Sequence, residues 1–296
     1  MSYIDLHIHS YYSNDGEYSP VDIISMCYEN ELKTAAITDH NTVKGIKEAK
    51  GKANELGLNL IPAIELDCVH KGINIHVLGY FIDEEHPGFL NNENMILEQE
   101  QRASKERISL VRDLGINVNL EEISKLAING MVTGEMIAEV SMNDKINKNN
   151  DLLRPYFEGG TRSDNPYVNF YWDFCSQGKP AYVPIQYISL DEAIEHITKS
   201  GGIAVLAHPG NNIGEDEDFL KDIIDKGVYG VEVYSSYHSN HQTEFYKNKA
   251  RELNVAMTCG SDFHGKIKPR IKIGSVSCEG KEAEIINDLR LYTKNA

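Results

Sequence analysis

Two histidines separated by one residue stand near the start of the chain, in the stretch YIDLHIHSYYSNDGEYSP. His7 and His9 lie in what reads as the first strand, and residues two apart on a strand point to the same face. Both imidazoles can therefore reach one point, where their neutral nitrogens suit a metal ion. An HxH pair by itself is as often incidental as functional, so its meaning depends on the rest of the chain.

Further ionisable side chains accompany other apolar, strand-like runs. They are Asp39 and His40 in TDH, Glu65 in PAIEL, His76 within INIHVLGY, His208 in AVLAHPG, and Asp262 and His264 in CGSDFHG. The carboxyl ends of parallel strands are where α/β folds build their sites. Burying so many ionisable groups unpaired would be prohibitively costly, and metal ions would compensate them. The pattern predicts a site for several metal ions with nitrogen and oxygen ligands.

The elements that must position these residues alternate along most of the chain. We expect strands at Ile4–Ile8, Thr34–Thr38, Leu60–Glu65, Ile73–Phe81, Ile203–Ala207, Gly230–Tyr234 and Val255–Cys259. We expect helices at Pro20–Glu31, Val43–Leu56, Leu190–Lys199, Glu217–Lys226, Asn240–Leu253 and Lys281–Tyr292. The alternation predicts an α/β fold with a parallel sheet, open or closed into a barrel. Ser19 and Ser189 suit helix N-caps, and Gly57 suits a helix end.

One long segment breaks this alternation. It begins with the strongly helical stretch EQEQRASKERISLVRDLGINVNLEEISKLA and continues with a polar and then an aromatic part. We interpret residues 86–179 as a mostly helical insertion that covers one end of a main domain formed by residues 1–85 and 180–296. Substrate selection is expected to lie in this insertion.

Composition narrows the classes of partner. The chain has 296 residues with 29 basic and 45 acidic side chains, a net charge of −16. Such an acidic surface repels duplex nucleic acid, so a phosphorylated substrate needs a local positive site. Five cysteines without a CxxC pair indicate neither a disulfide framework nor a thiolate zinc site. With no membrane-length apolar run and no signal pattern, we expect no membrane association and a cytoplasmic location. The oligomeric state stays open.

An ordered series of motifs resembles that of the PHP (polymerase and histidinol phosphatase) family. The motifs are DLHIHSYYSNDG, ITDHNTVKG, PAIELDC, INIHVLGYF, GGIAVLAHPG, GVEVYSSYHS and CGSDFHG. The nearest branch contains nucleotide bisphosphate phosphatases, 5′-to-3′ exoribonuclease-like members and a cyclic phosphate dihydrolase. The resemblance implies a distorted seven-stranded (β/α)7 barrel that holds two or three divalent metal ions. Mn²⁺, Fe²⁺ and Zn²⁺ all stay open, because affinity order alone does not choose between them.

The resemblance also implies roles for nine residues. In that family pattern a first metal is held by His7, His9 and Asp262, a second by His76 and His208, a third by Asp15, His40 and His264, and Glu65 bridges the first two. The implied reaction is hydrolysis of a phosphate ester by metal-bound hydroxide, with Glu65 and Asp262 at the catalytic centre. The expected substrate is small and phosphorylated: a nucleotide bisphosphate, a short oligonucleotide, or a sugar or cyclic phosphate.

Four further residues carry weaker expectations. His238 in VYSSYHSN could bind phosphate or protonate the leaving oxygen, or be an ordinary loop histidine. Arg102 and Arg107 could cradle a second phosphate, although they are about 140° apart on a helix and only one is expected to point inward; the alternative is solvated surface. Asp39 could orient His40, act as a carboxylate that supports the metal ligands from behind, or cap the following helix.

The chain also departs from the family pattern. An Arg and a His usual in a later insertion helix are missing from MVTGEMIAEVSM, and Arg154 or Arg162 could substitute. The aromatic run YVNFYWDF could stack on a base or belong to a core. Two other functions compete with phosphate-ester hydrolysis. One is a metal-dependent C–N hydrolase, which often needs a carbamylated lysine that is missing at these strand ends, and the other is a non-catalytic, metal-stabilised binding module.

Overall fold

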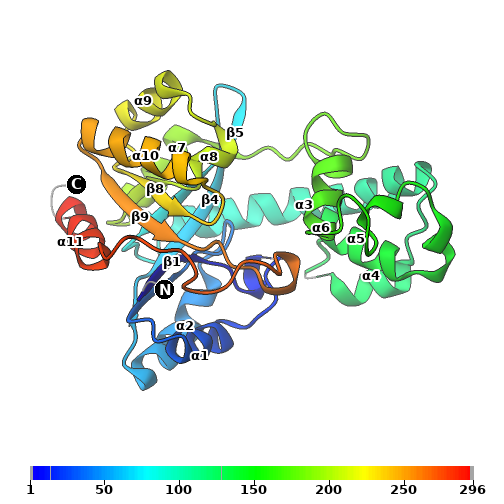
Figure 1. The fold of residues 1–296 in the computed structure, drawn as a ribbon, viewed down its shortest axis with the longest axis horizontal. Helices are drawn as coiled ribbons and strands as arrows, with labels where there is room; N and C mark the ends of the chain where they lie inside the picture. Colours follow the sequence, from blue (N-terminus) through cyan, green and yellow to red (C-terminus); the bar gives the residue numbers. More distant parts are fainter. Residues whose placement is uncertain (1–2, 14, 128, 294–296) are drawn as a thin grey trace.

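Two β-sheets flanked by helices form the larger part of the protein (Figure 1). The computed structural model describes residues 3–13, 15–127 and 129–293. The smaller sheet contains three parallel strands in the order β1 (Ile4–Ile8), β2 (Thr34–Ile37) and β3 (Asn59–Leu60). The larger sheet has the order β6 (Ile188–Ser189), β4 (Ala63–His70), β5 (Ile73–Tyr80), β7 (Ile203–Leu206), β8 (Gly230–Ser235) and β9 (Ala256–Gly260). The predicted α/β class is confirmed.

The larger sheet is mixed, so the expectation of a purely parallel sheet is wrong. Strand β5 runs antiparallel to both β4 and β7, whereas the other neighbours pair in parallel. The cause is a two-residue turn at Lys71 and Gly72, whose φ angles of 49° and 80° suit a tight hairpin. The strand expected at Leu60–Glu65 is divided between β3 and β4.

Helices lie between the strands at nearly the predicted positions. Beside the smaller sheet are α1 (Pro20–Glu29) and α2 (Lys44–Leu56). Beside the larger sheet are α7 (Leu190–Lys199), α8 (Pro209–Asn212), α9 (Glu217–Asp225), α10 (Asn240–Glu252) and α11 (Glu282–Thr293) (Figure 1). Ser19 and Ser189 accept backbone N–H groups as helix N-caps, and Ser189 forms a capping box with Glu192. Both predicted caps are confirmed.

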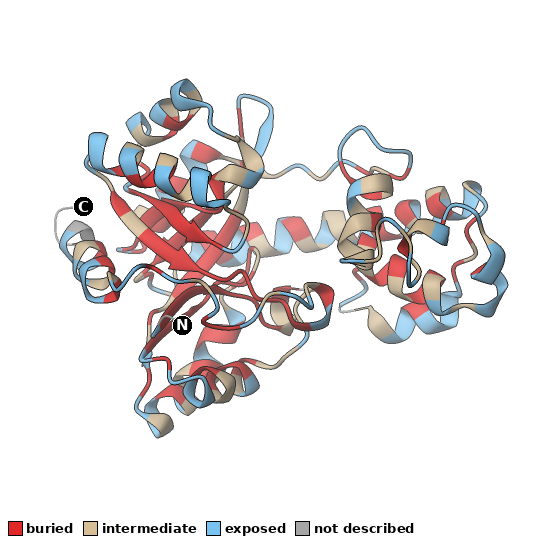
Figure 2. Ribbon diagram, in the orientation of Figure 1, coloured by how far each residue is buried: buried red, intermediate tan, exposed pale blue. Residues whose placement is uncertain are grey.

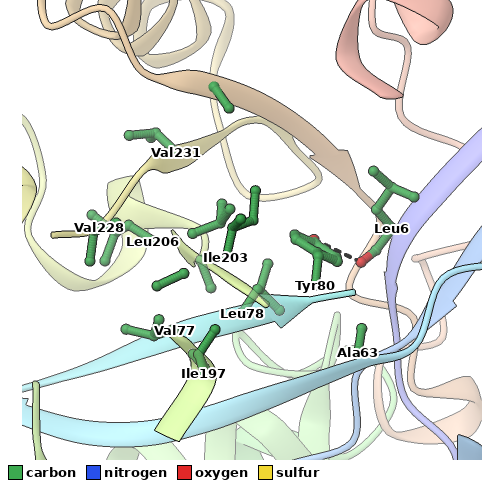
Figure 3. Close-up of a cluster of buried hydrophobic side chains, with 14 of the residues drawn as sticks. Leu6, Ala63, Val77, Leu78, Tyr80, Ile197, Ile203, Leu206, Val228 and Val231 are labelled. Atoms are coloured by element: carbon green, nitrogen blue, oxygen red, sulfur yellow. Dashed lines mark hydrogen bonds between the residues drawn. The ribbon is translucent and has the colours of Figure 1, made fainter. Parts of the chain in front are cut away.

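The two sheets contact each other at two places. Single bridges join Ile8 to Phe263 and His40 to Glu65. Between them, the buried Tyr80 on β5 donates a hydrogen bond of 2.9 Å to the carbonyl of Leu6 on β1 (Figure 3). The strands around this bond are buried on both faces, and Figure 2 shows them as a continuous buried layer. The sheets therefore share a core that leaves their polar strand ends facing one region.

The segment 86–179, called the cap below, extends away from the sheets (Figure 1). It contains α3 (Pro87–Asp113), α4 (Leu120–Leu126), α5 (Gly134–Asn143), α6 (Pro166–Phe170), the 3-10 helices η2 (Lys145–Asn149) and η3 (Arg154–Tyr156), and the π-helix η4 (Tyr171–Cys175). Two further 3-10 helices, η1 (Tyr11–Ser13) and η5 (Gly265–Ile267), lie outside it. A separate buried cluster includes Val111, Ile137 and Phe170.

Helix α3 belongs to both hydrophobic cores. Phe89, near its start, packs with the sheets, whereas Val111, near its end, packs with the cap. The division into domains 1–85 with 180–296 and 86–179 stays a prediction. Within the described ranges, no helix combines the length and the apolar character needed to cross a membrane.

Candidate metal centre

The first two histidines come from the end of β1 and are fully buried. The Nε2 atoms of His7 and His9 are 3.0 Å apart, so both imidazoles do point to one place. Two neutral imidazoles of the same tautomer would bring two lone pairs, or two N–H groups, face to face. A shared cation between them removes that conflict.

Glu65 on β4 lies at the middle of the cluster. Its Oε2 is 3.1 Å from the Nε2 atoms of both His7 and His9. Its Oε1 is 3.0 Å from His76 Nδ1 and 3.2 Å from His208 Nε2. One buried carboxylate thus contacts two pairs of imidazoles with two different oxygens, which is the geometry of a group shared by two ions.

Asp262 closes the first group from the loop after β9. Its Oδ1 lies 2.9 Å from His9 Nε2 and 3.3 Å from His7 Nε2. Its Oδ2 accepts hydrogen bonds of 2.5 Å from the Tyr237 hydroxyl and from Lys268 Nζ. Asp262 and His208 have φ angles of 57° and 25°, in the left-handed region. Non-glycine residues there are strained, and such strain is concentrated at functional sites.

A further group forms around His9. His264 stacks on His9 with ring centroids 4.0 Å apart, and its Nε2 is 3.1 Å from Asp15 Oδ2. Four sets of side chains have ligand atoms close enough to share an ion. They are His9 with Asp15, His40 and His264; His7 with His9, Glu65 and Asp262; His40 with Asp67 and His76; and Glu65 with His76 and His208. The structure therefore brings all nine predicted ligands together and adds Asp67.

The donor atoms fit divalent metal ions. Four buried ligand atoms lack a hydrogen-bonding partner: Asp15 Oδ1, His40 Nδ1, Asp67 Oδ1 and His264 Nε2. His264 Nε2 and His40 Nδ1 each lie 3.1 Å from a carboxylate oxygen, of Asp15 and Asp67, without hydrogen-bond geometry. Buried polar atoms nearly always have a partner, and a cation among these atoms would supply one. Imidazole and carboxylate donors without thiolates suit Mn²⁺, Fe²⁺ or Zn²⁺. The cluster can thus hold divalent metal ions.

Electrostatics keeps the central carboxylates ionised. Burial disfavours the charge of Glu65, but the imidazoles of His7 and His40 outweigh burial and hold its pKa well below the usual value. Burial of Asp262 is likewise outweighed, chiefly by the Lys268 ammonium, and its pKa is also held well below normal. Both carboxylates are therefore available as anionic ligands at neutral pH.

A second layer of buried side chains orients the ligands. Glu232 on β8 contacts His7 Nδ1 at 3.0 Å with one oxygen and accepts the backbone N–H of His208 at 2.7 Å with the other. A Cβ at Gly260 would lie 2.4 Å from Glu232 Oε1 and 2.2 Å from the Cβ of His7, so only glycine fits there. Sequence reasoning missed Glu232, and its only signal is a carboxylate inside the buried run GVEVY.

Asp39 supports a candidate metal ligand from behind, which is one of the roles expected for it, but the ligand is His9 and not His40. It accepts hydrogen bonds from the Ser10 hydroxyl at 2.7 Å and from the Ser13 hydroxyl at 3.0 Å. The Ser13 oxygen also lies 2.8 Å from His9 Nδ1. Asp39 therefore acts on His9 through Ser13. It does not cap α2, because that helix begins at Lys44.

The structure does not place His238 for either predicted role, which is a correction. Its Nε2 accepts the backbone N–H of Gly210 at 3.0 Å, and its Nδ1 lies 2.9 Å from the carbonyl of Val233. Both ring nitrogens are thus engaged with the backbone, and the ring stacks on Tyr246. His238 positions the turn after His208. Lys268 and Tyr237, both missed in the sequence, are the donors beside Asp262.

Only one of the two predicted cap arginines points inward. Arg107 is buried and lines the main cavity, whereas Arg102 is exposed and does not. The substitutes Arg154 and Arg162 pair with Asp151 and Asp173, away from the cavity lining.

A cavity of about 540 Å³ lies between the metal-ligand cluster and the cap. Asp15, His40, His76, His208 and Asp262 line one end of it. Tyr171 and Trp172 of the aromatic run line the other, whereas Phe170 is core; stacking of Tyr171 or Trp172 on a base stays a prediction. Asn92 on α3 donates to Asn41, which donates in turn to Asp67 at 2.7 Å.

The PHP domain family model matches residues 5–233. The chain belongs to the PHP family. This membership confirms the resemblance carried by the ordered motifs.

Several relatives share most of the chain. A 5′-3′ exoribonuclease of Escherichia coli is 30% identical over 279 residues, 91% of this chain and 87% of that protein. A 3′,5′-nucleoside bisphosphate phosphatase of Chromobacterium violaceum is 28% identical and covers 89% and 88% of the two chains. A phosphoribosyl 1,2-cyclic phosphate 1,2-diphosphodiesterase of Eggerthella lenta is 24% identical over 88% and 94%. All three names describe cleavage of phosphate esters by those proteins.

Two solved structures share the fold of this PHP protein. An amidohydrolase of Chromobacterium violaceum with bound sulfate superposes with a TM-score of 0.80 at 23% identity over 97% of both chains. A protein of Bifidobacterium adolescentis assigned as a metal-dependent phosphoesterase gives 0.78 at 23% identity over 96% of both chains. The likeness extends over the cap as well as the two sheets.

Proposed function

We propose that this PHP protein is a metal-dependent phosphoesterase that hydrolyses a small phosphorylated substrate. The observation that carries the proposal is the pair of contacts made by Glu65, whose two oxygens each meet two imidazoles at 3.0 to 3.2 Å. A carboxylate in this position can join two cations, and paired cations are the usual machinery for in-line displacement at phosphorus. The names of the relatives support the same reaction.

The residues of this chain would share the work as follows. His7, His9, Asp15, His40, Glu65, His76, His208, Asp262 and His264 would hold two or three divalent ions. Those ions, when bound, supply a Lewis acid and lower the pKa of coordinated water. The two sheets would act as one distorted barrel around them, and the cap would select the substrate in a cytoplasmic enzyme.

Lys268 would contribute a fixed positive charge beside Asp262. Burial lowers its pKa, but the Asp262 carboxylate outweighs burial and raises the pKa well above the usual value. An ammonium that holds its proton so firmly can contact a phosphate oxygen, but it is a poor proton donor to a leaving group. Lys268 is also a poor candidate for carbamylation, because that modification needs a neutral amine. It therefore does not support the alternative of a C–N hydrolase.

Phosphate release from a panel of phosphate esters in the presence of Mn²⁺ tests the proposal. The wild type should release phosphate from at least one ester, and Asp262→Asn should lower kcat/KM by about 10²-fold or more, as is usual for loss of a charged group at the reacting centre. Asp222→Asn is the matched control, because Asp222 contacts His70 outside the cavity. A metal-loaded wild type inactive on every ester, or a fully active Asp262→Asn, would contradict it.

A further inference from the structure

Hydrolysis of a phosphate ester leaves an oxygen that must gain a proton, and the side chains around Asp262 do not supply one. A positioned acid speeds the cleavage of esters whose leaving oxygen is strongly basic. His238 was an expected donor, but both of its ring nitrogens are engaged with the backbone. The Tyr237 hydroxyl and the Lys268 ammonium are committed to Asp262 Oδ2, at 2.5 Å each. The role of proton donor is therefore open to another side chain of the cavity.

Glu135 lines the cavity from the cap, in the first turn of α5. Two cations of this region pair with other carboxylates: Arg107 with Glu100 at 3.3 Å and Lys266 with Glu139 at 2.9 Å. Within the described residues, Glu135 itself takes part in no ion pair. Its carboxyl group thus has no fixed cation that would hold it in the ionised form.

Close packing fixes the first turn of α5 against η4. Thr133 caps the helix by accepting the backbone N–H of Met136 at 3.2 Å. A Cβ at Gly134 would lie 3.0 Å from both Cys175 Sγ and Tyr171 Cδ2, so glycine lets α5 approach η4 this closely. Glu135 is the next residue, and its backbone is therefore held firmly at the cavity wall.

The surroundings of Glu135 favour its protonated form. Burial raises the pKa of Glu135 to about 7, and the nearby Asp15 carboxylate adds to this effect. Because Asp15 lies 3.1 Å from His264 in the candidate metal centre, Glu135 is within electrostatic reach of that centre. A bound phosphate dianion would favour the protonated form further. An acid with a pKa near the working pH is well matched to donate a proton in a transition state.

We propose that Glu135 is the general acid that protonates the leaving oxygen of the ester. The attacking water forms the new bond to phosphorus and gives up a proton to solvent. The bond from phosphorus to the leaving oxygen breaks, and the carboxyl proton of Glu135 passes to that oxygen. The products are an alcohol and phosphate, and the Glu135 carboxylate regains a proton from solvent. The proposal rests on the phosphoesterase function above and adds a catalytic residue to it.

Two phosphate esters with Mn²⁺ test the proposal, because their leaving oxygens differ in their need for a proton. Benzyl phosphate releases a strongly basic alkoxide, whereas 4-nitrophenolate is a weak base that leaves without a proton. Glu135→Gln should lower kcat for benzyl phosphate by about 10²-fold or more and for 4-nitrophenyl phosphate by less than about tenfold, since general acids contribute about 10²- to 10⁴-fold. A residue with only a structural role would lower both by the same factor.

Glu100→Gln is the matched control, because Glu100 lines the same cavity but its charge is balanced by Arg107. It should change kcat for both esters by one factor. Melting temperatures check folding, and competition with a chromogenic chelator checks that Glu135→Gln binds Mn²⁺ as the wild type does. An unchanged kcat for benzyl phosphate, equal losses on the two esters, or a loss that follows weakened Mn²⁺ binding would overturn the role of Glu135.

The wild type supplies a further check, since it should hydrolyse both esters. A wild type that cleaves only 4-nitrophenyl phosphate would show that no side chain protonates a basic leaving oxygen, which also overturns the proposal. Inactivity on both esters has the same consequence for Glu135. The phosphoesterase function itself falls only if the wild type leaves the whole panel of esters intact.

Discussion

Buried polar side chains fix the orientation of three imidazoles at the candidate metal centre. Glu232 contacts His7, Ser13 contacts His9, and Asn212 Oδ1 lies 2.8 Å from His208 Nδ1. Such partners set the tautomer and ring angle of a ligand, and their loss typically lowers metal affinity 10- to 100-fold. The geometry at the ligands therefore depends on residues that do not touch the ion.

Replacement of Glu232 tests this dependence. Glu232→Gln should weaken Mn²⁺ binding by about 10- to 100-fold, because the amide can accept only one of the two hydrogen bonds that Glu232 now accepts. Binding is measured by competition with a chromogenic chelator, which needs no substrate. Glu244→Gln on the outer face of α10 is the control. An unaltered dissociation constant in a folded Glu232→Gln would show that His7 is held by other contacts.

Eight of the nine candidate ligands follow or interrupt an apolar run in the sequence, whereas Asp15, in the polar stretch SNDGE, was expected only from the resemblance to the PHP family. Asp67 had a usable signal, since it lies two residues after Glu65 on β4 and shares its face. Lys268 had none, because it reaches Asp262 from a loop without periodicity. His238 was misassigned because a motif match locates a residue without saying which way its nitrogens point.

The hairpin of β4 and β5 was not predicted from the sequence, which favoured a parallel sheet. The candidate metal centre depends on this hairpin more than on any other pair of strands. Antiparallel pairing sets Asp67 opposite His76 and places Glu65 beside Leu78. A crossover helix would have separated these strands in the chain. The two residues Lys71 and Gly72 were a readable hairpin signal, whereas the two-residue strand β6 is too short to leave one.

Alanine substitutions at two glycines test the hairpin assignment, because they should change the free energy of unfolding in opposite directions. Gly72→Ala should lower the free energy of unfolding by about 1 kcal/mol, because φ at this position is 80°. Gly51→Ala should raise it by about 0.5 to 1 kcal/mol, because Gly51 lies inside α2 with nothing within 4 Å of an added Cβ. Urea unfolding of the metal-free proteins measures both. Changes of the same sign would contradict the turn geometry.

At the scale of the whole molecule, the polar ends of the two sheets meet at the candidate metal centre. The carboxylates gathered there repel one another. Asp15, Glu65, Asp67 and Asp262 converge there from three separate segments, since Glu65 and Asp67 share β4. Cations bound only by the folded chain stabilise it in proportion to the logarithm of their concentration over the dissociation constant. Stability and metal content should therefore change together.

Metal removal gives the corresponding prediction. Mn²⁺ at 100 times its dissociation constant should stabilise the chelator-treated protein by about 2.7 kcal/mol per site, a rise in Tm of about 5 °C or more for a chain of this size. Differential scanning calorimetry measures the shift. Asp262→Asn should show a smaller shift, and Asp222→Asn the full one. If Mn²⁺ does not change the Tm, the cluster of candidate ligands is held together by hydrogen bonds alone.

One long helix connects the two ends of the cavity. Helix α3 is seated among the sheets at Phe89, supplies Glu100 and Arg107 to the far wall, and reaches Asp67 through Asn92 and Asn41. Because α3 is attached both to the sheets and to the cap, a change in its tilt at one attachment would move the other. A ligand that shifts α3 at the aromatic end would therefore also shift Asn92 and, through Asn41, the carboxylate of Asp67.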